Sequence, residues 1–435
     1  MLLVYTYKLT PRIRYVFKHI LTRILQIPID FTTKVEEFVA HNGPKFSYSK
    51  VPLGKEFFVK SHELLFQQGI KDVEISIGKW DGVPCFFYQG EKSDIPFDIF
   101  SASFYLISRY EEYLPHIKDS YERFKASESI AFKNNFLEKP VVDIWAYQFL
   151  NELKTRYPAY TYKERVFQYI STIDVDNAYA YKHKSFARTM GGFLKDIYQL
   201  EVFNIWDRFA VLFNLKKDPF DTFQKIIDSK KKHDVRTIFF FLIGNYTSYD
   251  TNVSAAKPKF KLLIKDMVDY ARVGLHPSYY TMKNFEMLKK EKNRLELITN
   301  MPVIRSRQHY LRFSLPDTYR KLIDLEVLED YSMGYASKVG FRASTCTPFY
   351  FYDIDFEIQT PLKIFPFAVM DTTLNDYMKL TPKRALGKIS DLKKEVKKVN
   401  GYFITLFHNE SLSNYQRWKG WSRLYDSMLK IVKRE

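Results

Sequence analysis

Two aspartates follow a strand-like run in the middle of the chain. The run at 166–173 leads into the sequence TIDVD, residues 172–176. If the backbone stays extended there, Asp174 and Asp176 lie two residues apart and their side chains point to the same face. Neighbouring carboxylates repel each other unless a cation or a shared proton offsets their charge. The pair therefore indicates a divalent metal site, and a pair of solvated turn aspartates is the alternative that this motif leaves open.

Histidines and arginines follow four later strand-like runs. The sequence GLHPSYYT places His276 at the end of one run, and RSRQHYLR places Arg307 and His309 at the end of the next. GFRAST contains Arg342, and GYFITLFHNES brings His408 to the end of the last run. A single histidine is more often structural than a ligand, but random placement would rarely put Asp, His or Arg at five strand ends. This coincidence indicates metal binding combined with acid–base catalysis.

Alternating strands and helices would position these residues. Apolar periodicity predicts strands at 166–173, 237–244, 273–276, 303–309, 330–336, 363–370 and 401–407. It predicts helices from about residue 219 and at 258–272, 284–299, 316–325, 382–399 and 415–432. Repeated strand–helix units predict a parallel sheet, and their number suggests a barrel. In such barrels the active site lies at the carboxyl ends of the strands.

The first part of the chain contains no motif for chemistry. It mixes a strand-like run at 83–88 with predicted helices at 97–113 and 141–155, and a polar, tyrosine-rich stretch at 156–163 marks a boundary. An amphipathic helix predicted near 13–25 could lie on an anionic bilayer, but packing against its own domain is the interpretation that we prefer. We expect a smaller mixed α/β domain at 1–163, followed by a second α/β domain at 164–435.

Composition restricts the class of protein. Of the 435 residues, 46% are hydrophobic and 27% are charged, and the formal net charge is +17. The basic residues are spread along the chain without an arginine-rich arm or a zinc finger, so we expect no nucleic-acid partner. There are two cysteines, no secretory signal is readable, and no apolar stretch approaches the ~18 residues of a membrane span. We expect a cytoplasmic protein without a transmembrane segment; peripheral membrane contact and the oligomeric state stay open.

From residue 166 to residue 433 the sequence resembles the polysaccharide deacetylase family with its NodB-type domain, in a branch found in Bacteroidetes that carries an extra N-terminal domain. TIDVD is similar to the family's first motif, whose two aspartates are the general base and a metal ligand, and these correspond to Asp174 and Asp176. GLHPSYYT resembles its histidine motif, GFRAST its arginine motif and LFHNES its last motif. The resemblance implies a distorted (β/α) barrel in which Arg342 orients the base and His408 is the general acid.

The histidine motif departs from the family pattern of two histidines four residues apart. The position four after His276 is Tyr280. A catalytic Zn²⁺ site normally has three protein ligands and an open position, and Tyr280 is a poor ligand because its phenol must lose a proton near a pKa of ~10. We therefore predict that His309 on the neighbouring strand replaces the missing histidine. Asp176, His276 and His309 would then hold a divalent metal, which we expect to be Zn²⁺.

Other residues are assigned by their positions around this metal. Asp371 follows the predicted strand at 363–370 and is expected to keep His408 in its charged form. Arg307, Tyr310 and Glu410 are expected to contact the substrate.

The implied reaction is metal-dependent hydrolysis of an acetyl group. We expect an N-acetyl group on a sugar of a cell-surface polysaccharide or its precursor, so the expected partner is an acetylated sugar. The alternative is a catalytically inactive carbohydrate-binding protein that keeps the barrel. A third interpretation, a basic nucleic-acid-binding protein, has no supporting motif.

Overall fold

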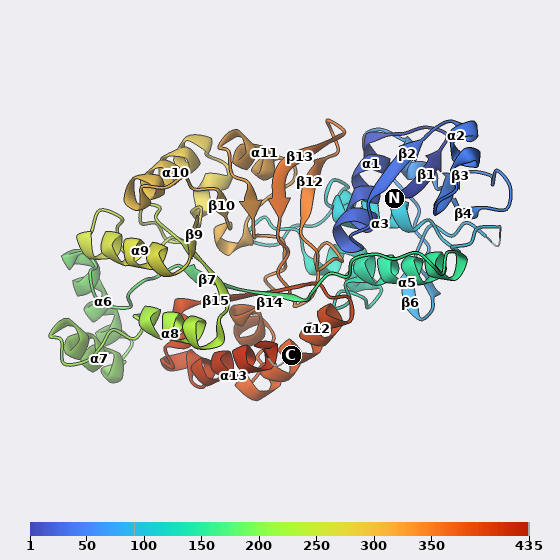
Figure 1. Ribbon diagram of the computed structural model, residues 1–435. Coiled ribbons are helices and arrows are strands. Elements are labelled where there is room, and N and C mark those ends of the chain that lie inside the picture. Colours follow the sequence, from blue (N-terminus) through green and yellow to red (C-terminus); the bar gives the residue numbers. More distant parts are fainter. Residues whose placement is uncertain (91, 434–435) are drawn as a thin grey trace.

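A small parallel sheet forms the centre of the N-terminal part of the computed structural model, which describes residues 1–90 and 92–433 (Figure 1). Strands β1 (Leu2–Thr6), β2 (Ile29–Thr32), β3 (Lys45–Ser49) and β4 (Phe57–Lys60) pair in parallel in the order β2-β1-β3-β4. β5 (Gly78–Trp80) and β6 (Val83–Cys85) form a separate antiparallel pair. The helices of this part are α1 (Pro11–Phe17), α2 (Val35–Ala40), α3 (Ile99–Ile107), α4 (Ile130–Lys133) and α5 (Val141–Arg156).

The amphipathic segment at 13–25 packs inside this part of the protein. α1 continues into a π-helix, Lys18–Ile24, and the apolar side chains from Ile13 to Leu25 are buried. Packing against its own domain is therefore confirmed, and the segment presents no apolar face to a bilayer.

A larger, mostly parallel sheet carries the residues singled out above. Its strand order is β12-β13-β11-β10-β9-β8-β7-β15-β14, and β12 and β13 are the pair that runs antiparallel. The strands are β7 (Gln168–Val175), β8 (Arg236–Phe241), β9 (Arg272–Leu275), β10 (Arg305–Ser306), β11 (Glu329–Asp330), β12 (Phe349–Asp353), β13 (Ile358–Ile364), β14 (Val369–Met370) and β15 (Tyr402–His408). The helices are α6 (Phe186–Tyr198), α7 (Val202–Leu212), α8 (Phe223–His233), α9 (Pro258–Tyr270), α10 (Phe285–Thr299), α11 (Asp317–Asp324), α12 (Pro382–Lys398) and α13 (Trp421–Lys433).

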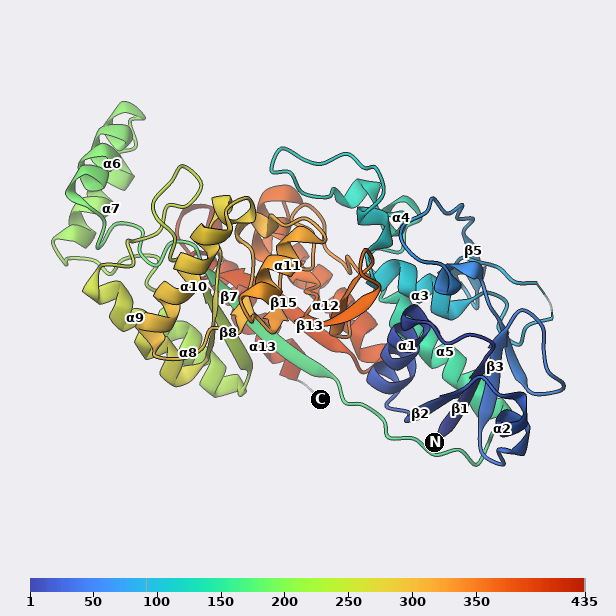
Figure 2. The same ribbon diagram turned by 90° about the horizontal axis from the view of Figure 1, so that it is seen from above.

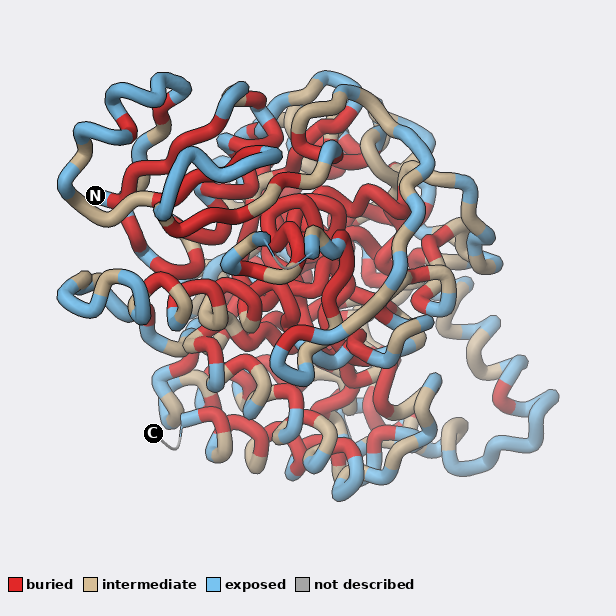
Figure 3. The backbone as a smooth tube through the Cα atoms, turned by 90° about the vertical axis from the view of Figure 1, so that its right-hand side faces the viewer, coloured by how far each residue is buried: buried red, intermediate tan, exposed pale blue. Residues whose placement is uncertain are grey.

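The central strands are apolar on both faces. On β8, Ile238 and Phe240 belong to a core cluster inside the sheet, whereas Phe239 and Phe241 pack in the core that the helices share. Both faces are covered, which explains why this strand is a continuous apolar run rather than an alternating one. The buried stretches gather in the middle of the molecule (Figure 3). The core on the helical side also includes residues of the N-terminal sheet, so the two parts pack on one another.

One stretch of chain links the two ends of the large sheet. Between β13 and β14, Phe365 N donates a hydrogen bond to Asp330 O at β11 (2.8 Å), and Ala368 N donates to Ile404 O of β15 (3.0 Å). The sheet that was expected to form a barrel therefore curls until its two edges are joined by this stretch.

Some elements differ from the sequence-based expectation. The strand predicted at 303–309 is reduced to β10, because the chain turns into a short 3₁₀ helix at His309–Leu311. The strand predicted at 363–370 is split between β13 and β14. β12, α6 and α7 were not predicted. Figure 2 shows α6 and α7 projecting from one end of the molecule.

Candidate metal centre

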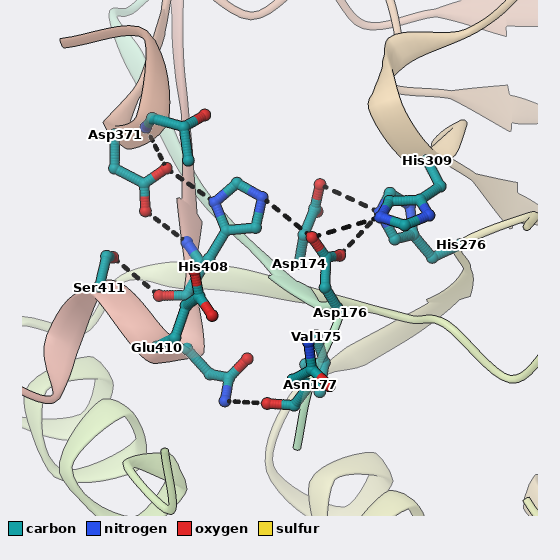
Figure 4. Close-up of polar contacts among 12 residues, drawn as sticks. Asp174, Val175, Asp176, Asn177, His276, His309, Asp371, His408, Glu410 and Ser411 are labelled. Carbon is teal, nitrogen blue, oxygen red and sulfur yellow. Dashed lines mark hydrogen bonds and ion pairs between the residues drawn. The ribbon is translucent and has the colours of Figure 1, made fainter. Parts of the chain in front are cut away.

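β7 carries the two predicted carboxylates to the edge of the sheet. Asp174 is on the strand and Asp176 is one residue beyond its end, while Val175 between them is buried in the core on the other side. This alternation places both carboxylates on one face, as predicted. Figure 4 shows them facing His276 and His309.

His276 follows the last residue of β9 and points at the same carboxylates. Its Nε2 atom is 3.1 Å from Oδ1 of Asp176 and 3.8 Å from Oδ2 of Asp174. Its Nδ1 atom is hydrogen-bonded to the main-chain carbonyl of Arg307, and a carbonyl can only accept, so the proton of a neutral imidazole sits on Nδ1. The lone pair of Nε2 then faces the carboxylates.

His309 approaches Asp176 from the short 3₁₀ helix that follows the neighbouring strand β10. Its Nε2 atom is 3.4 Å from Oδ2 of Asp176, and its Nδ1 atom is 2.9 Å from Oδ1 of the buried Asp250. The rings of His276 and His309 have centroids 5.0 Å apart. A carboxylate on the outer nitrogen is the usual way in which a metal-binding histidine is oriented. The structure thus places His309 where we predicted, and Tyr280 is exposed.

The three side chains fit a small divalent cation. One potential ligand atom from each of Asp176, His276 and His309 lies within 4.8 Å of the other two. Oδ1 of Asp176 is buried and has no hydrogen-bond partner among the described residues. This oxygen faces Nε2 of His276, so that two hydrogen-bond acceptors point at each other. Such a contact in a buried site is unfavourable in free energy unless a cation lies between the two atoms. One carboxylate and two imidazoles suit Zn²⁺ and other divalent transition-metal ions.

The ionisable groups of this centre are strongly coupled. Burial raises the pKa of Asp176, but His309 and His408 together hold it well below its usual range. Burial lowers the pKa of His309, but Asp176 and Asp250 raise it to about 9. The ionised carboxylate of Asp176 therefore favours the protonated form of the His309 imidazole. A metal ion would compete with this proton for the ring nitrogen.

Arg307, and not Arg342, holds Asp174. Nη1 of Arg307 donates to Oδ1 of Asp174 (2.9 Å) and to Oγ1 of Thr172 (2.7 Å), and its Nε donates to the carbonyl of Tyr331 (3.0 Å). The Arg307 side chain is completely buried. It therefore holds the carboxylate from within the sheet, and it is not among the described residues that line the cavity over the site, where the predicted substrate contact would be made.

Arg342 faces the N-terminal part instead. Its Nε and Nη2 atoms donate to the two carboxylate oxygens of Glu112 at 2.9 and 2.6 Å. Arg109 also pairs with Glu112 (2.7 Å). Burial raises the pKa of Glu112, but Arg342 and Arg109 lower it to about 2. The expectation that Arg342 orients Asp174 is therefore wrong. Its guanidinium pairs instead with the buried carboxylate of Glu112, more than two hundred residues upstream.

His408 lies on the other side of Asp176, at the end of β15. Its Nδ1 atom is 2.7 Å from Oδ1 of Asp371, and its main-chain N–H donates to Oδ2 of the same carboxylate (2.7 Å). Its Nε2 atom points at Oδ2 of Asp176, 3.6 Å away (Figure 4). Burial lowers the pKa of His408, but Asp371 and Asp176 raise it well above its ordinary value. Asp371 thus lies where it can keep His408 charged, as predicted.

A cavity of about 210 Å³ opens over these groups. Tyr310 and Glu410, two of the residues expected to contact the substrate, line it together with Arg417. Nη2 of Arg417 pairs with Oε1 of Glu410 (2.9 Å), and burial raises the pKa of Glu410. The cavity therefore combines the candidate metal ligands with an aromatic ring and charged side chains.

The N-terminal part contributes to this cavity through the loop at 119–124. Arg123 lines the cavity, and its Nη1 atom donates to the main-chain carbonyl of Tyr310 (2.8 Å). The ring of Tyr121 stacks on Tyr310 with centroids 5.1 Å apart. Tyr310 and Leu311 both have positive φ angles, 59° and 53°, directly after His309, which is an unfavourable conformation for such residues. The loop therefore supports the turn that presents His309.

Sequence reasoning missed Asp250, Tyr121 and Arg123. Asp250 lies in the loop after β8, 59 residues before its partner His309, and Arg123 lies 187 residues before Tyr310. Neither belongs to a motif, and only the fold brings them to the centre.

Comparison with known proteins gives a family match for the N-terminal part and distant structural matches for the chain. Residues 2–158 match a family of unknown function, DUF7033. No curated protein matches the sequence. The chain is also similar to solved structures of polysaccharide deacetylases over about 60% of its length.

Three of these structures illustrate the likeness. A candidate polysaccharide deacetylase from Mycobacterium smegmatis aligns over 63% of this chain and 87% of its own, with 12% identity and a TM-score of 0.40. The polysaccharide deacetylase Bc1974 from Bacillus cereus aligns over 61% and 88%, with 13% identity and a TM-score of 0.31. A CE4 family pseudoenzyme from Bacillus anthracis aligns over 61% and 63%, with 15% identity and a TM-score of 0.28.

Proposed function

We propose that this protein is a metal-dependent hydrolase that removes an acetyl group, in N-acetyl form, from a sugar of a cell-surface polysaccharide or its precursor. The observation that carries the proposal is the convergence of Asp176, His276 and His309 on one point, with Asp174 and His408 next to them. As parts of the same proposal, the curled sheet is a distorted (β/α) barrel of the NodB type, the metal is Zn²⁺ and the protein is cytoplasmic.

Asp174 is the proposed general base. A bound divalent ion would supply a Lewis acid that polarises the acetyl oxygen and makes water more acidic. The carboxylate of Asp174 takes the proton of the water that attacks the acetyl carbon, through the oxygen that Arg307 does not hold. The charge-assisted hydrogen bond from Arg307 keeps the carboxylate ionised and in place.

His408 is the proposed general acid. With Nδ1 held by Asp371, its Nε2–H is the proton that points into the cavity. It protonates the sugar nitrogen as the carbon–nitrogen bond breaks, so that the products are acetate and the free amine. The two catalytic groups come from register partners on the neighbouring strands β7 and β15. The carboxylate of Asp174 lies beside His276, and Nε2 of His408 points at Asp176.

Measurement of acetate release tests the proposal against its alternative. The purified protein should release acetate from at least one member of a panel of N-acetylated sugars and oligosaccharides, and lose this activity with a chelator. A catalytically inactive carbohydrate-binding protein would bind a sugar without releasing acetate. The change of the second motif histidine to Tyr280 favours that alternative, whereas the position of His309 favours catalysis.

A further inference from the structure

The hairpin formed by α6 and α7 exposes an unusual amount of apolar surface. Within the described part of the chain, 32 large apolar side chains are exposed, and 12 of them lie between residues 186 and 215. On α6 they recur at helical spacing, as Phe186, Met190, Leu194 and Ile197, and on α7 as Val202, Trp206, Phe209 and Phe213. Soluble proteins rarely expose an apolar patch of this kind without a binding function.

The inside of the hairpin is polar. Nε and Nη2 of Arg208 on α7 donate to Oδ2 of Asp196 on α6 at 2.9 and 2.7 Å, and both side chains are buried. The guanidinium also lies over the rings of Phe193 and Tyr181. Gly192 lets the helices approach, because a Cβ atom there would overlap the Arg208 guanidinium. An ion pair inside and apolar side chains outside reverse the arrangement expected of a hairpin in water.

The exposed residue types suit the boundary of a lipid bilayer. Tyr198, Phe203 and Trp206 are exposed on this hairpin, and aromatic side chains of this kind gather at the headgroup level of membranes. Lysines stand at both ends of the segment, Lys182 and Lys184 before α6 and Lys216 and Lys217 after α7. Residues 182–217 contain seven Lys or Arg and three Asp or Glu, a net charge of +4. This charge complements an anionic lipid surface.

The hairpin is attached to the edge of the sheet that carries the metal centre. It follows the carboxyl end of β7, where Asp174 and Asp176 lie. Oδ1 of Asn204 on α7 accepts hydrogen bonds from Tyr415 Oη (3.1 Å) and Gln416 Nε2 (2.9 Å), in the loop after β15. A surface bound by the hairpin would therefore lie near the carboxyl ends of β7 and β15.

We propose that the α6–α7 hairpin docks this protein on the surface of an anionic lipid bilayer. Its apolar side chains enter the headgroup region, and the lysines at its two ends contact anionic lipids. The protein binds the membrane peripherally: within residues 1–90 and 92–433, no helix combines the length and hydropathy needed to span a bilayer. The docking does not depend on the proposed catalytic function.

Tryptophan fluorescence of the full chain tests the docking directly. All five tryptophans lie in the described residues; Trp206 is 62% exposed, and the other four are at most 9% exposed. Addition of vesicles of phosphatidylcholine and phosphatidylglycerol should shift the emission of Trp206 to the blue, and brominated lipids should quench it. Vesicles of phosphatidylcholine alone should give a weaker effect, and added salt should reduce binding. The Trp206→Phe variant should lose the spectral change and still sediment with the anionic vesicles.

Paired substitutions separate docking from other uses of this surface. The double variant Leu200→Ser/Phe203→Ser should bind anionic vesicles about tenfold more weakly or worse, because two exposed apolar side chains are lost. Leu297→Ser on α10, an equally exposed leucine outside the hairpin, should bind like the wild type. Absence of vesicle binding by the wild type would overturn the proposal. Concentration-dependent dimers that the double variant abolishes, without vesicle binding, would overturn it in favour of a second copy of the chain.

Discussion

Replacement of Arg307 by lysine should reduce turnover without removing the metal. The arginine makes three hydrogen bonds at once, to Asp174, Thr172 and the carbonyl of Tyr331. A lysine keeps the positive charge but cannot reproduce this geometry. A hydrogen bond to a charged group contributes about 1.5–3 kcal/mol. Loss of the orienting bond to Asp174 in the transition state then corresponds to a fall in kcat of roughly 10- to 150-fold.

The matched control is the same substitution at Arg342. Arg342→Lys breaks the bidentate contact with Glu112 at the junction with the N-terminal part. We expect the free energy of unfolding to fall by about 1.5–3 kcal/mol, with kcat per folded molecule unchanged. The assay measures acetate release, bound metal and urea unfolding for both variants. A large loss of kcat in Arg342→Lys together with normal turnover in Arg307→Lys would refute the assignment.

Three further substitutions test other parts of the site. Asp174→Asn should reduce acetate release by about 10²–10⁴-fold and leave bound metal unchanged; equal losses of both would make Asp174 a ligand. Glu112→Gln should lower the free energy of unfolding by about 3 kcal/mol near neutral pH. The reason is that Arg342 and Arg109 lower the pKa of Glu112 to about 2, although burial alone would raise it. The difference in the free energy of unfolding between the wild type and this variant should disappear as the pH falls from about 4.5 to about 2. A difference in urea unfolding that does not change with pH would contradict the ion pair. Arg123→Ala should weaken metal binding about tenfold, because the turn after His309 loses its support. Lys118→Ala, an exposed change in the same region, should leave the metal affinity unchanged. Equal affinities in the two variants would show that the loop is not needed.

The positions of the candidate metal ligands were predictable because strand geometry is regular. Residues two apart on an extended strand face the same way, so TIDVD placed Asp174 and Asp176 together. Parallel strands end at one edge, so His276 and His309 could be expected to meet there. These inferences need only the local backbone and the order of neighbouring strands.

The two arginines show where sequence reasoning fails. Arg307 lies at the end of one predicted strand and Arg342 follows another. Which carboxylate each guanidinium contacts depends on the tertiary structure. Arg342 pairs with Glu112 of the N-terminal part rather than with Asp174. No local sequence pattern predicts this contact. The helices α6 and α7 were missed for a different reason. They lie outside the strand–helix units from which the fold was predicted, and most of their large apolar side chains are exposed rather than packed on the sheet.

The most direct test of the proposed function is the location of a bound metal. Crystals of the protein with Zn²⁺ should show one anomalous peak held by Asp176, His276 and His309, and the His309→Ala variant should lose at least about tenfold in metal affinity. An ion bound elsewhere, or a wild type that takes up no divalent metal, would contradict the metal-dependent mechanism. Either result would favour the alternative of a catalytically inactive carbohydrate-binding protein.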